Sequence, residues 1–191
     1  MKVYLIDTKE IDSLECSSIN EEILKHINHH ADEKVKKCSL FAYLLLFSLV
    51  GELNINFEKK PYIVNSNIKF NISHTGDYVC LVISNEEVGV DIEYKNRIIS
   101  DTLKKKMMST NELNEYLKVN EEESLISLWT KKEAYLKYLG NGINQRLNEI
   151  DTSKLKFISI DHQELVITIY GKGNIENINF INVNNYKNYI K

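Results

Sequence analysis

The sequence predicts a mixed α/β (α+β) fold of two similar halves that meet near residue 90. A pattern of strand, helix and strands occurs once before Asp91 and once after it. Each half also contains one long stretch of helical periodicity, and no flexible linker separates the halves. We therefore expect a front half over residues 1–90 and a back half over residues 91–191, packed together as one compact unit.

The long helix of the front half is the clearest element there. Asp32 can cap its first turn, and its centre is apolar nearly all round, which is typical of a buried helix. Two apolar runs flank residues 85–87 and predict a β-hairpin around them. The expected elements of this half are strands at 2–6, 68–73, 78–84 and 88–93 and helices at 21–28 and 32–53.

The back half starts with helix signals. Ser109 and Glu112 have the spacing of a capping box, in which each residue satisfies a free backbone N–H of the other. A long helical pattern then ends at Gly140, a residue that commonly terminates helices. The expected elements of this half are a helix at 121–139 and strands at 157–160, 164–170 and 178–183.

Composition excludes several classes of function. A net charge of −3 over 191 residues gives no basic field, so we expect no nucleic-acid partner. The longest apolar stretch, residues 40–50, is shorter than the roughly 20 residues that span a bilayer, and we expect no membrane association. Cys16, Cys38 and Cys80 have no metal-ligand spacing and are expected to be reduced thiols of a cytoplasmic protein.

Three histidines gather at the end of the first predicted helix. His26 and His30 are four residues apart and would share one helix face, where they could bind a metal, with His29 beside them. Because no third ligand is evident nearby, we favour the alternative that they are ordinary surface histidines.

The segment Val88-Gly89-Val90-Asp91-Ile92-Glu93 predicts a pair of acids on one side of a strand. Side chains alternate along a strand, so Asp91 and Glu93 point the same way while their apolar neighbours anchor the opposite face. Two such carboxylates repel unless a cation lies between them, and a divalent ion with oxygen ligands meets that need. The alternative is an exposed strand end with solvated acids. Gly89 leaves room for another backbone or a ligand to approach.

The segment Trp129 to Lys137 predicts an acid and a lysine on one helix face. Glu133 and Lys137 are four residues apart, with Trp129 one turn earlier on the same face. A simple surface ion pair, worth about 0.3 to 0.5 kcal/mol, would explain this spacing equally well.

Two further segments suggest a site for phosphate. Ser73 and His74 stand where a predicted strand ends, and a hydroxyl, an imidazole and free backbone amides suit phosphate oxygens. Pro61 biases Lys60 to an extended conformation, although a solvated turn is a competing interpretation. Three carboxylates, lysines and an anion pocket are together the groups that a magnesium-bound pyrophosphate requires.

These motifs resemble those of the 4'-phosphopantetheinyl transferases, in particular the two-lobed surfactin-synthetase-activating (Sfp) type. Val88-Gly89-Val90-Asp91 matches the (V/I)G(I/V)D stretch of that family, and Trp129 to Lys137 matches its (F/W)(S/C/T)xKE(S/A)xxK stretch. The resemblance covers residues 60–142. It implies a pseudo-twofold fold in which each half is a helix packed on a small antiparallel sheet, with the ligand between the halves.

The resemblance also implies an activity. Members of the family transfer the phosphopantetheine arm of coenzyme A to a serine of an apo carrier protein and release 3',5'-adenosine bisphosphate, with Mg²⁺ or Mn²⁺ as the ion. Carriers of fatty-acid, polyketide and nonribosomal-peptide synthesis all qualify. The mid-chain position of the Asp91 motif further implies a monomer, because the small trimeric relatives carry this motif at the N-terminus.

The resemblance assigns roles by position. Asp91, Glu93 and Glu133 would hold the metal, and Glu133 would be the base toward the carrier serine. Asp91, Glu133 and Lys137 would be the catalytic residues. The residues expected to contact coenzyme A are Lys37, Lys60, Pro61, Ser73, His74, Asp91, Lys132, Glu133 and Lys137.

The chain departs from the family pattern at one place, and two other functions are alternatives to the transfer reaction. Gly140-Asn141-Gly142 stands where the family often has Gly-Lys-Gly, so one phosphate or carrier contact is expected to differ. The alternatives are a catalytically impaired module that binds coenzyme A or a carrier protein, and a different magnesium-dependent phosphohydrolase.

Overall fold

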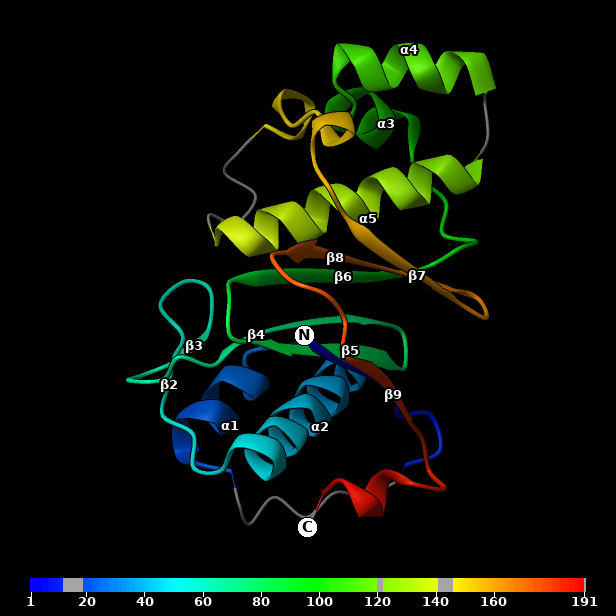
Figure 1. The fold of residues 1–191 in the computed structure, drawn as a ribbon. Helices are drawn as coiled ribbons and strands as arrows, with labels where there is room; N and C mark the ends of the chain where they lie inside the picture. Colours follow the sequence, from blue (N-terminus) through cyan, green and yellow to red (C-terminus); the bar gives the residue numbers. More distant parts are fainter. Residues whose placement is uncertain (12–18, 120–121, 141–145, 191) are drawn as a thin grey trace.

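The computed structural model describes residues 1–11, 19–119, 122–140 and 146–190. It has the mixed α/β fold that the sequence predicts (Figure 1). The elements up to residue 94 are β1 (Lys2–Asp7), α1 (Glu21–Asn28), α2 (Glu33–Val50), β2 (Ile55–Asn56), β3 (Tyr62–Ile63), β4 (Lys69–Thr75), β5 (Tyr78–Ser84) and β6 (Val88–Tyr94). Those that follow are α3 (Asp101–Met107), α4 (Thr110–Val119), α5 (Glu122–Leu139), β7 (Ile158–His162), β8 (Leu165–Gly171) and β9 (Asn177–Ile181), with short 3-10 turns η2 (Leu147–Glu149), η3 (Thr152–Lys154) and η4 (Tyr186–Asn188).

Two sheets form the centre of the molecule. The first has the strand order β4-β5-β1-β9, with α1 and α2 on its outer face, and the second has the order β6-β8-β7, with α5 on its outer face (Figure 1). The apolar side chains of both sheets form one cluster that includes Val3, Val82, Val90 and Ile167. α3 and α4 lie beyond α5, at the end of the molecule farthest from α2.

The two sheets are joined along their edges by β4 and β6. Each is the edge strand of its own sheet, and the link between them is made by side chains: Asn71 Oδ1 accepts a hydrogen bond from the backbone N–H of Val90 at 2.8 Å. Further along, Ser73 and Thr75 of β4 donate to Asp91 and Glu93 of β6. This junction therefore brings the predicted phosphate segment to the predicted acid pair.

Two details of the predicted topology are wrong. β5 and β6 belong to different sheets, so the chain crosses between sheets at residues 85–87 instead of forming a hairpin. The hairpin is β4–β5, whose turn contains Gly76 at φ +54°. The first sheet is also not purely antiparallel, because β9 pairs parallel to β1. β9 thus completes the front sheet from the back half, and the division at residue 90, which falls within β6, stays a prediction.

The predicted helices begin close to where they were expected. Asp32 caps α2 by accepting from the N–H of Lys34 at 2.7 Å, although α2 ends at Val50, before Gly51. α5 matches its predicted range within one residue and is followed by Gly140 at φ +70°. Among the described residues, no helix is long and apolar enough to cross a membrane.

Candidate active site

The site begins with the close contact between α5 and β6 at Gly89. A Cβ atom at this position would lie 2.0 Å from the carbonyl oxygen of Ala134 and 2.4 Å from the backbone nitrogen of Tyr138. Only glycine permits this approach, so the glycine admits a backbone and not a ligand. As a result, the acids of β6 lie directly beside Glu133 and Lys137 of α5.

Asp91 and Lys137 form the centre of the site. Asp91 is 5% exposed, and its Oδ1 accepts from Lys137 Nζ at 2.6 Å and from Ser73 Oγ at 2.8 Å. Lys137 Nζ also donates to Ser73 Oγ at 2.7 Å, which closes a three-membered network. The solvated-acid alternative is therefore wrong for Asp91, and Lys137 pairs with the strand and not with Glu133 of its own helix.

Two buried carboxylate oxygens of this site have no hydrogen-bond partner in the described part of the chain. They are Asp91 Oδ2 and Glu133 Oε1. Burial raises the pKa of Glu133, as does the negative charge of Asp91, while Lys137 and Arg97 oppose the shift. Buried polar groups are normally satisfied, so two open oxygens on neighbouring acids indicate a place for a positively charged ligand.

Glu93 lies beside this pair but is already engaged. Its Oε2 accepts from Thr75 Oγ1 at 3.0 Å, and its Oε1 forms an ion pair with Arg97. The Arg97 guanidinium also lies over the Trp129 ring, 5.2 Å from its centroid. Trp129 therefore shares the face of Glu133, as predicted, and contacts a residue that the sequence did not bring to attention.

The three acids differ in how well they fit a divalent ion. Within the described ranges, no three His, Cys, Asp or Glu side chains converge as metal ligands. Asp91 and Glu133 fit such an ion because each has a buried, unpartnered oxygen. The expected third ligand, Glu93, is occupied by Thr75 and Arg97, so the structure does not present three ready carboxylates.

His74 joins the site to the histidines at the end of α1. Burial lowers the pKa of His74, and the positive charges of Lys137 and His30 lower it further. The His30 ring meets His74 edge to face at a centroid distance of 6.4 Å, and His26 stacks on Phe57 at 4.2 Å. His30 is thus a neighbour of the site, whereas His26 packs on an aromatic ring.

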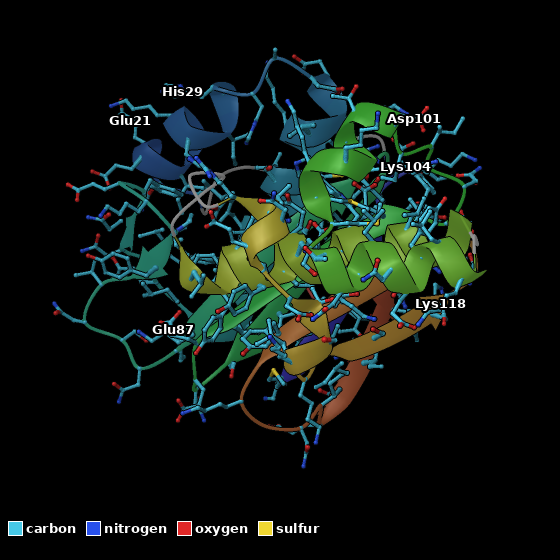
Figure 2. All side chains as sticks on the ribbon, turned by 90° about the horizontal axis from the view of Figure 1, so that it is seen from above. Glu21, His29, Glu87, Asp101, Lys104 and Lys118 are labelled. Carbon is cyan, nitrogen blue, oxygen red and sulfur yellow. The ribbon has the colours of Figure 1, made fainter. Side chains whose placement is uncertain are left out.

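Lys60 is held at one end of β6 and α5. Its ammonium donates to the carbonyl oxygens of Val88 at 2.7 Å and Tyr138 at 3.2 Å, and it pairs with Glu87 at 2.9 Å. These contacts use the three donors of a lysine. Figure 2 places Glu87 on the side of the molecule away from Lys104 and Lys118. The solvated-turn interpretation is therefore wrong for Lys60, and the half-buried Pro61 follows it directly.

Lys132 does not reach the site, which corrects its expected contact with coenzyme A. The side chain is fully buried, and its ammonium pairs with Glu112 at 2.7 Å and donates to the carbonyl oxygens of Leu147 and Ile150. On α5 it points about 100° away from Glu133, toward the turns η2 and η3. Lys37 lies half-buried on α2, and Asn141 lies outside the described residues.

Sequence reasoning missed two members of the site. Arg97 lies in the segment after β6 and contacts Glu93, four residues before it. A four-residue spacing predicts a contact only in a helix, and this segment has no helical periodicity. Thr75 lies beyond the predicted strand at 68–73 but is part of β4, where its hydroxyl donates to Glu93. Its alternation with Ser73 along one strand was the available signal.

Comparisons with known proteins point to one family. A sequence profile described as the 4'-phosphopantetheinyl transferase superfamily matches residues 87–189. The chain is 33% identical over 140 residues to the 4'-phosphopantetheinyl transferase gsp of Aneurinibacillus migulanus. The aligned segment covers 67% of this chain and 57% of that protein. It is 33% identical over 82 residues to the 4'-phosphopantetheinyl transferase Sfp of Bacillus subtilis, covering 41% and 36%.

A eukaryotic relative extends the comparison. The L-aminoadipate-semialdehyde dehydrogenase-phosphopantetheinyl transferase of Saccharomyces cerevisiae is 28% identical over 152 residues, covering 69% of this chain and 56% of that protein. The chain spans about half the length of the curated relatives it matches. The matched segment is more than half of the chain and contains Asp91, Glu133 and Lys137. This chain therefore belongs to the 4'-phosphopantetheinyl transferase superfamily.

Proposed function

We propose that this chain transfers the 4'-phosphopantetheine arm of coenzyme A to a serine of an apo carrier protein. The observation that carries the proposal is the pair of buried, unpartnered oxygens on Asp91 and Glu133, next to the half-buried ammonium of Lys137. Two carboxylates that need a cation, with a lysine beside them, suit a metal-bound diphosphate. Membership of the superfamily supports the choice of coenzyme A and a carrier protein over other diphosphates and acceptors.

The reaction balances with the groups of this site. The serine oxygen of the carrier forms a bond to the phosphorus that bears pantetheine, and the bond from that phosphorus to 3',5'-adenosine bisphosphate breaks. The serine proton passes to Glu133, directly or through water, and Lys137 offsets the charge that develops on the departing phosphate. A bound Mg²⁺ or Mn²⁺ would supply further charge neutralisation, held by Asp91 and Glu133. Positioning and charge stabilisation provide most of the acceleration in phosphoryl transfer.

The other residues have supporting roles in this proposal. Ser73 orients Asp91 and Lys137 through its hydroxyl, and His74 faces the nucleotide phosphates. Lys37, Pro61 and Lys60 are candidates for other contacts with coenzyme A, with the ammonium of Lys60 already bound to three acceptors of the protein. We assign no ligand contact to Lys132. We also propose that the chain acts as a monomer and that it works in the cytoplasm. The free, buried thiols of Cys38 and Cys80 agree with a reducing compartment.

A transfer assay tests the proposal. The chain is incubated with coenzyme A, Mg²⁺ and a panel of apo carriers from fatty-acid, polyketide and nonribosomal-peptide synthesis, and intact-mass spectrometry follows the gain of one phosphopantetheine arm. Asp91→Ala should lower the rate by about 10³-fold or more, because it removes a preorganised charge from the transition state. Asp161→Ala is the matched control, since Asp161 is an exposed acid of β7 that pairs only with Lys95 at 3.3 Å among the described residues.

The same assay separates the alternatives. Tight binding of coenzyme A with no mass gain on any carrier would identify a binding module. Release of phosphate without a carrier would identify a phosphohydrolase. Either result, obtained with folded wild-type protein, would refute the proposed transfer.

A further inference from the structure

Arg97 occupies an unusual position for an arginine next to a cation-binding pair of acids. Its guanidinium is held between the Glu93 carboxylate and the Trp129 ring, and its charge is close enough to oppose the raised pKa of Glu133. The chain has only one other arginine, Arg146, which forms a surface pair with Glu149 at 3.7 Å. Arg97 is therefore a positive charge placed beside the acids by the local fold.

The consequence is an unequal set of carboxylates. Asp91 and Glu133 each have an open, buried oxygen, whereas Arg97 and Thr75 occupy both oxygens of Glu93. Glu93 can turn toward a bound ion only after it leaves Arg97. This exchange is feasible because the Arg97 side chain is 39% exposed, and ion pairs with one solvated partner contribute little to stability.

We propose that Arg97 is a positioning residue that holds Glu93 away from the divalent ion and so weakens ion binding by the chain without its substrates. This inference rests on the metal site of the proposed function and deepens it. A divalent ion held by Asp91 and Glu133 competes with the single charge of Arg97 for Glu93, and the stronger charge draws the carboxylate over.

Trp129 explains why an arginine suits this position. Once Glu93 turns away, the guanidinium keeps its contact with the indole face, an interaction that favours arginine over lysine. Trp129 thus gives Arg97 a place to remain near Glu93, from which it can take the carboxylate back when the ion leaves. Because of Arg97 and Trp129, Glu93 becomes the third ligand only when the ion is bound.

The first test measures ion affinity, not activity. Mn²⁺ is titrated into the full chain without coenzyme A, and free Mn²⁺ is followed by electron paramagnetic resonance. Arg97→Gln should bind Mn²⁺ about fivefold more tightly than wild type, the factor expected for removal of one partly exposed ion pair. Arg97→Lys, which keeps the charge, should restore most of the wild-type affinity, and Arg146→Gln should match wild type.

A double variant shows whether the effect passes through Glu93. If Arg97 acts by withholding this carboxylate, then Arg97→Gln should give no gain in affinity when Glu93→Gln is already present. A gain of the same size in the double variant would show that Arg97 acts only through general repulsion, and would overturn the proposal.

The second test uses the only tryptophan in the chain. Mg²⁺, which does not quench fluorescence itself, should change the emission of Trp129 in wild type as Arg97 exchanges its carboxylate, and should leave that of Arg97→Gln unchanged. Equal Mn²⁺ affinity of wild type and Arg97→Gln, or no binding by either, overturns the proposal. The transfer assay is independent, so an active enzyme whose Arg97→Gln variant binds Mn²⁺ like wild type refutes this inference alone.

Discussion

α5 carries two lysine–carboxylate pairs on different faces, and they have opposite properties. Lys137 pairs with Asp91 at 2.6 Å and is 30% exposed, while Lys132 pairs with Glu112 at 2.7 Å and is fully buried. Both lysines belong to the nine-residue segment Trp129 to Lys137, and the two ion pairs have nearly the same length. Ion-pair distance therefore does not distinguish a ligand site from a structural contact.

The difference lies in how completely each pair is satisfied. Lys132 has three acceptors, because it also donates to the carbonyl oxygens of Leu147 and Ile150, and Glu112 accepts from the backbone N–H groups of Ser109 and Thr152. The Asp91 pair instead leaves one buried oxygen without a partner among the residues that the structure describes. A network with every partner in place rigidifies a fold, whereas one with an open oxygen retains capacity for a ligand.

The largest expected effect comes from replacing each lysine by methionine. Lys132→Met leaves Glu112 as a buried, partly uncompensated charge, and we expect it to lower the free energy of unfolding by about 3 to 5 kcal/mol. Lys137→Met should cost less, about 1 to 3 kcal/mol, because the buried Asp91 loses its cation but Oδ1 keeps the hydrogen bond from Ser73, and the Lys137 ammonium is itself partly solvated. Urea denaturation followed by far-UV circular dichroism measures both values.

Methionine is the replacement for both lysines because it keeps the shape of the side chain nearly constant. It retains much of the length of the lysine stem, so the lost charge and hydrogen bonds dominate the change in stability. Equal destabilisation by the two substitutions would contradict the distinction between a satisfied and an open pair.

The sequence predicted the helix face of Glu133 and Lys137 but not the partner of Lys132. Helical periodicity correctly placed Glu133 and Lys137 on one face, and the capping box of Ser109 and Glu112 is present, with Ser109 N–H donating to Glu112 at 2.7 Å. The partner of Lys132 could not be predicted, because Glu112 is twenty residues away in sequence and its second carboxylate oxygen serves Thr152 on a distant turn. Periodicity gives the direction of a side chain but not what lies there.

The same limit explains the wrong hairpin. The apolar runs of β5 and β6 would look alike whether the strands paired or crossed between sheets, since both strands are buried. What the local pattern did give was the direction of Asp91 and the need for Gly89. The identity of the approaching backbone, α5, depends on the packing of elements far apart in sequence.

Gly89→Ala tests whether the open pair depends on the close contact of α5 with β6. The added Cβ would meet backbone atoms of Ala134 and Tyr138, so α5 must shift, and we expect a loss of about 1 to 3 kcal/mol in stability. The shift also displaces Glu133 and Lys137 from Asp91, so transfer activity should fall by more than the stability change explains.

Gly171→Ala is the matched control for this substitution. A Cβ at Gly171 of β8 would lie 2.9 Å from the carbonyl oxygen of Glu87, a milder contact that does not involve α5. We expect a smaller loss of stability and little loss of activity. Full activity in a folded Gly89→Ala protein would show that the site does not require the contact.

The smallest expected effect is the acid dependence of the satisfied pair. Burial by itself would raise the pKa of Glu112, but hydrogen bonds from Lys132, Ser109 and Thr152 lower it below its usual value. A carboxylate whose pKa is depressed by folding stabilises the protein above its unfolded pKa and loses that contribution as the pH falls through the folded pKa. The stability advantage of wild type over Glu112→Gln should therefore be constant above about pH 6 and shrink steadily below about pH 4.5.

Denaturation curves of both proteins at matched pH values measure this advantage. Because other carboxylates titrate in both proteins, only the difference between the curves is informative. A difference that grows on acidification would mean that Glu112 is protonated in the native state and that Lys132 is held by the carbonyl oxygens alone.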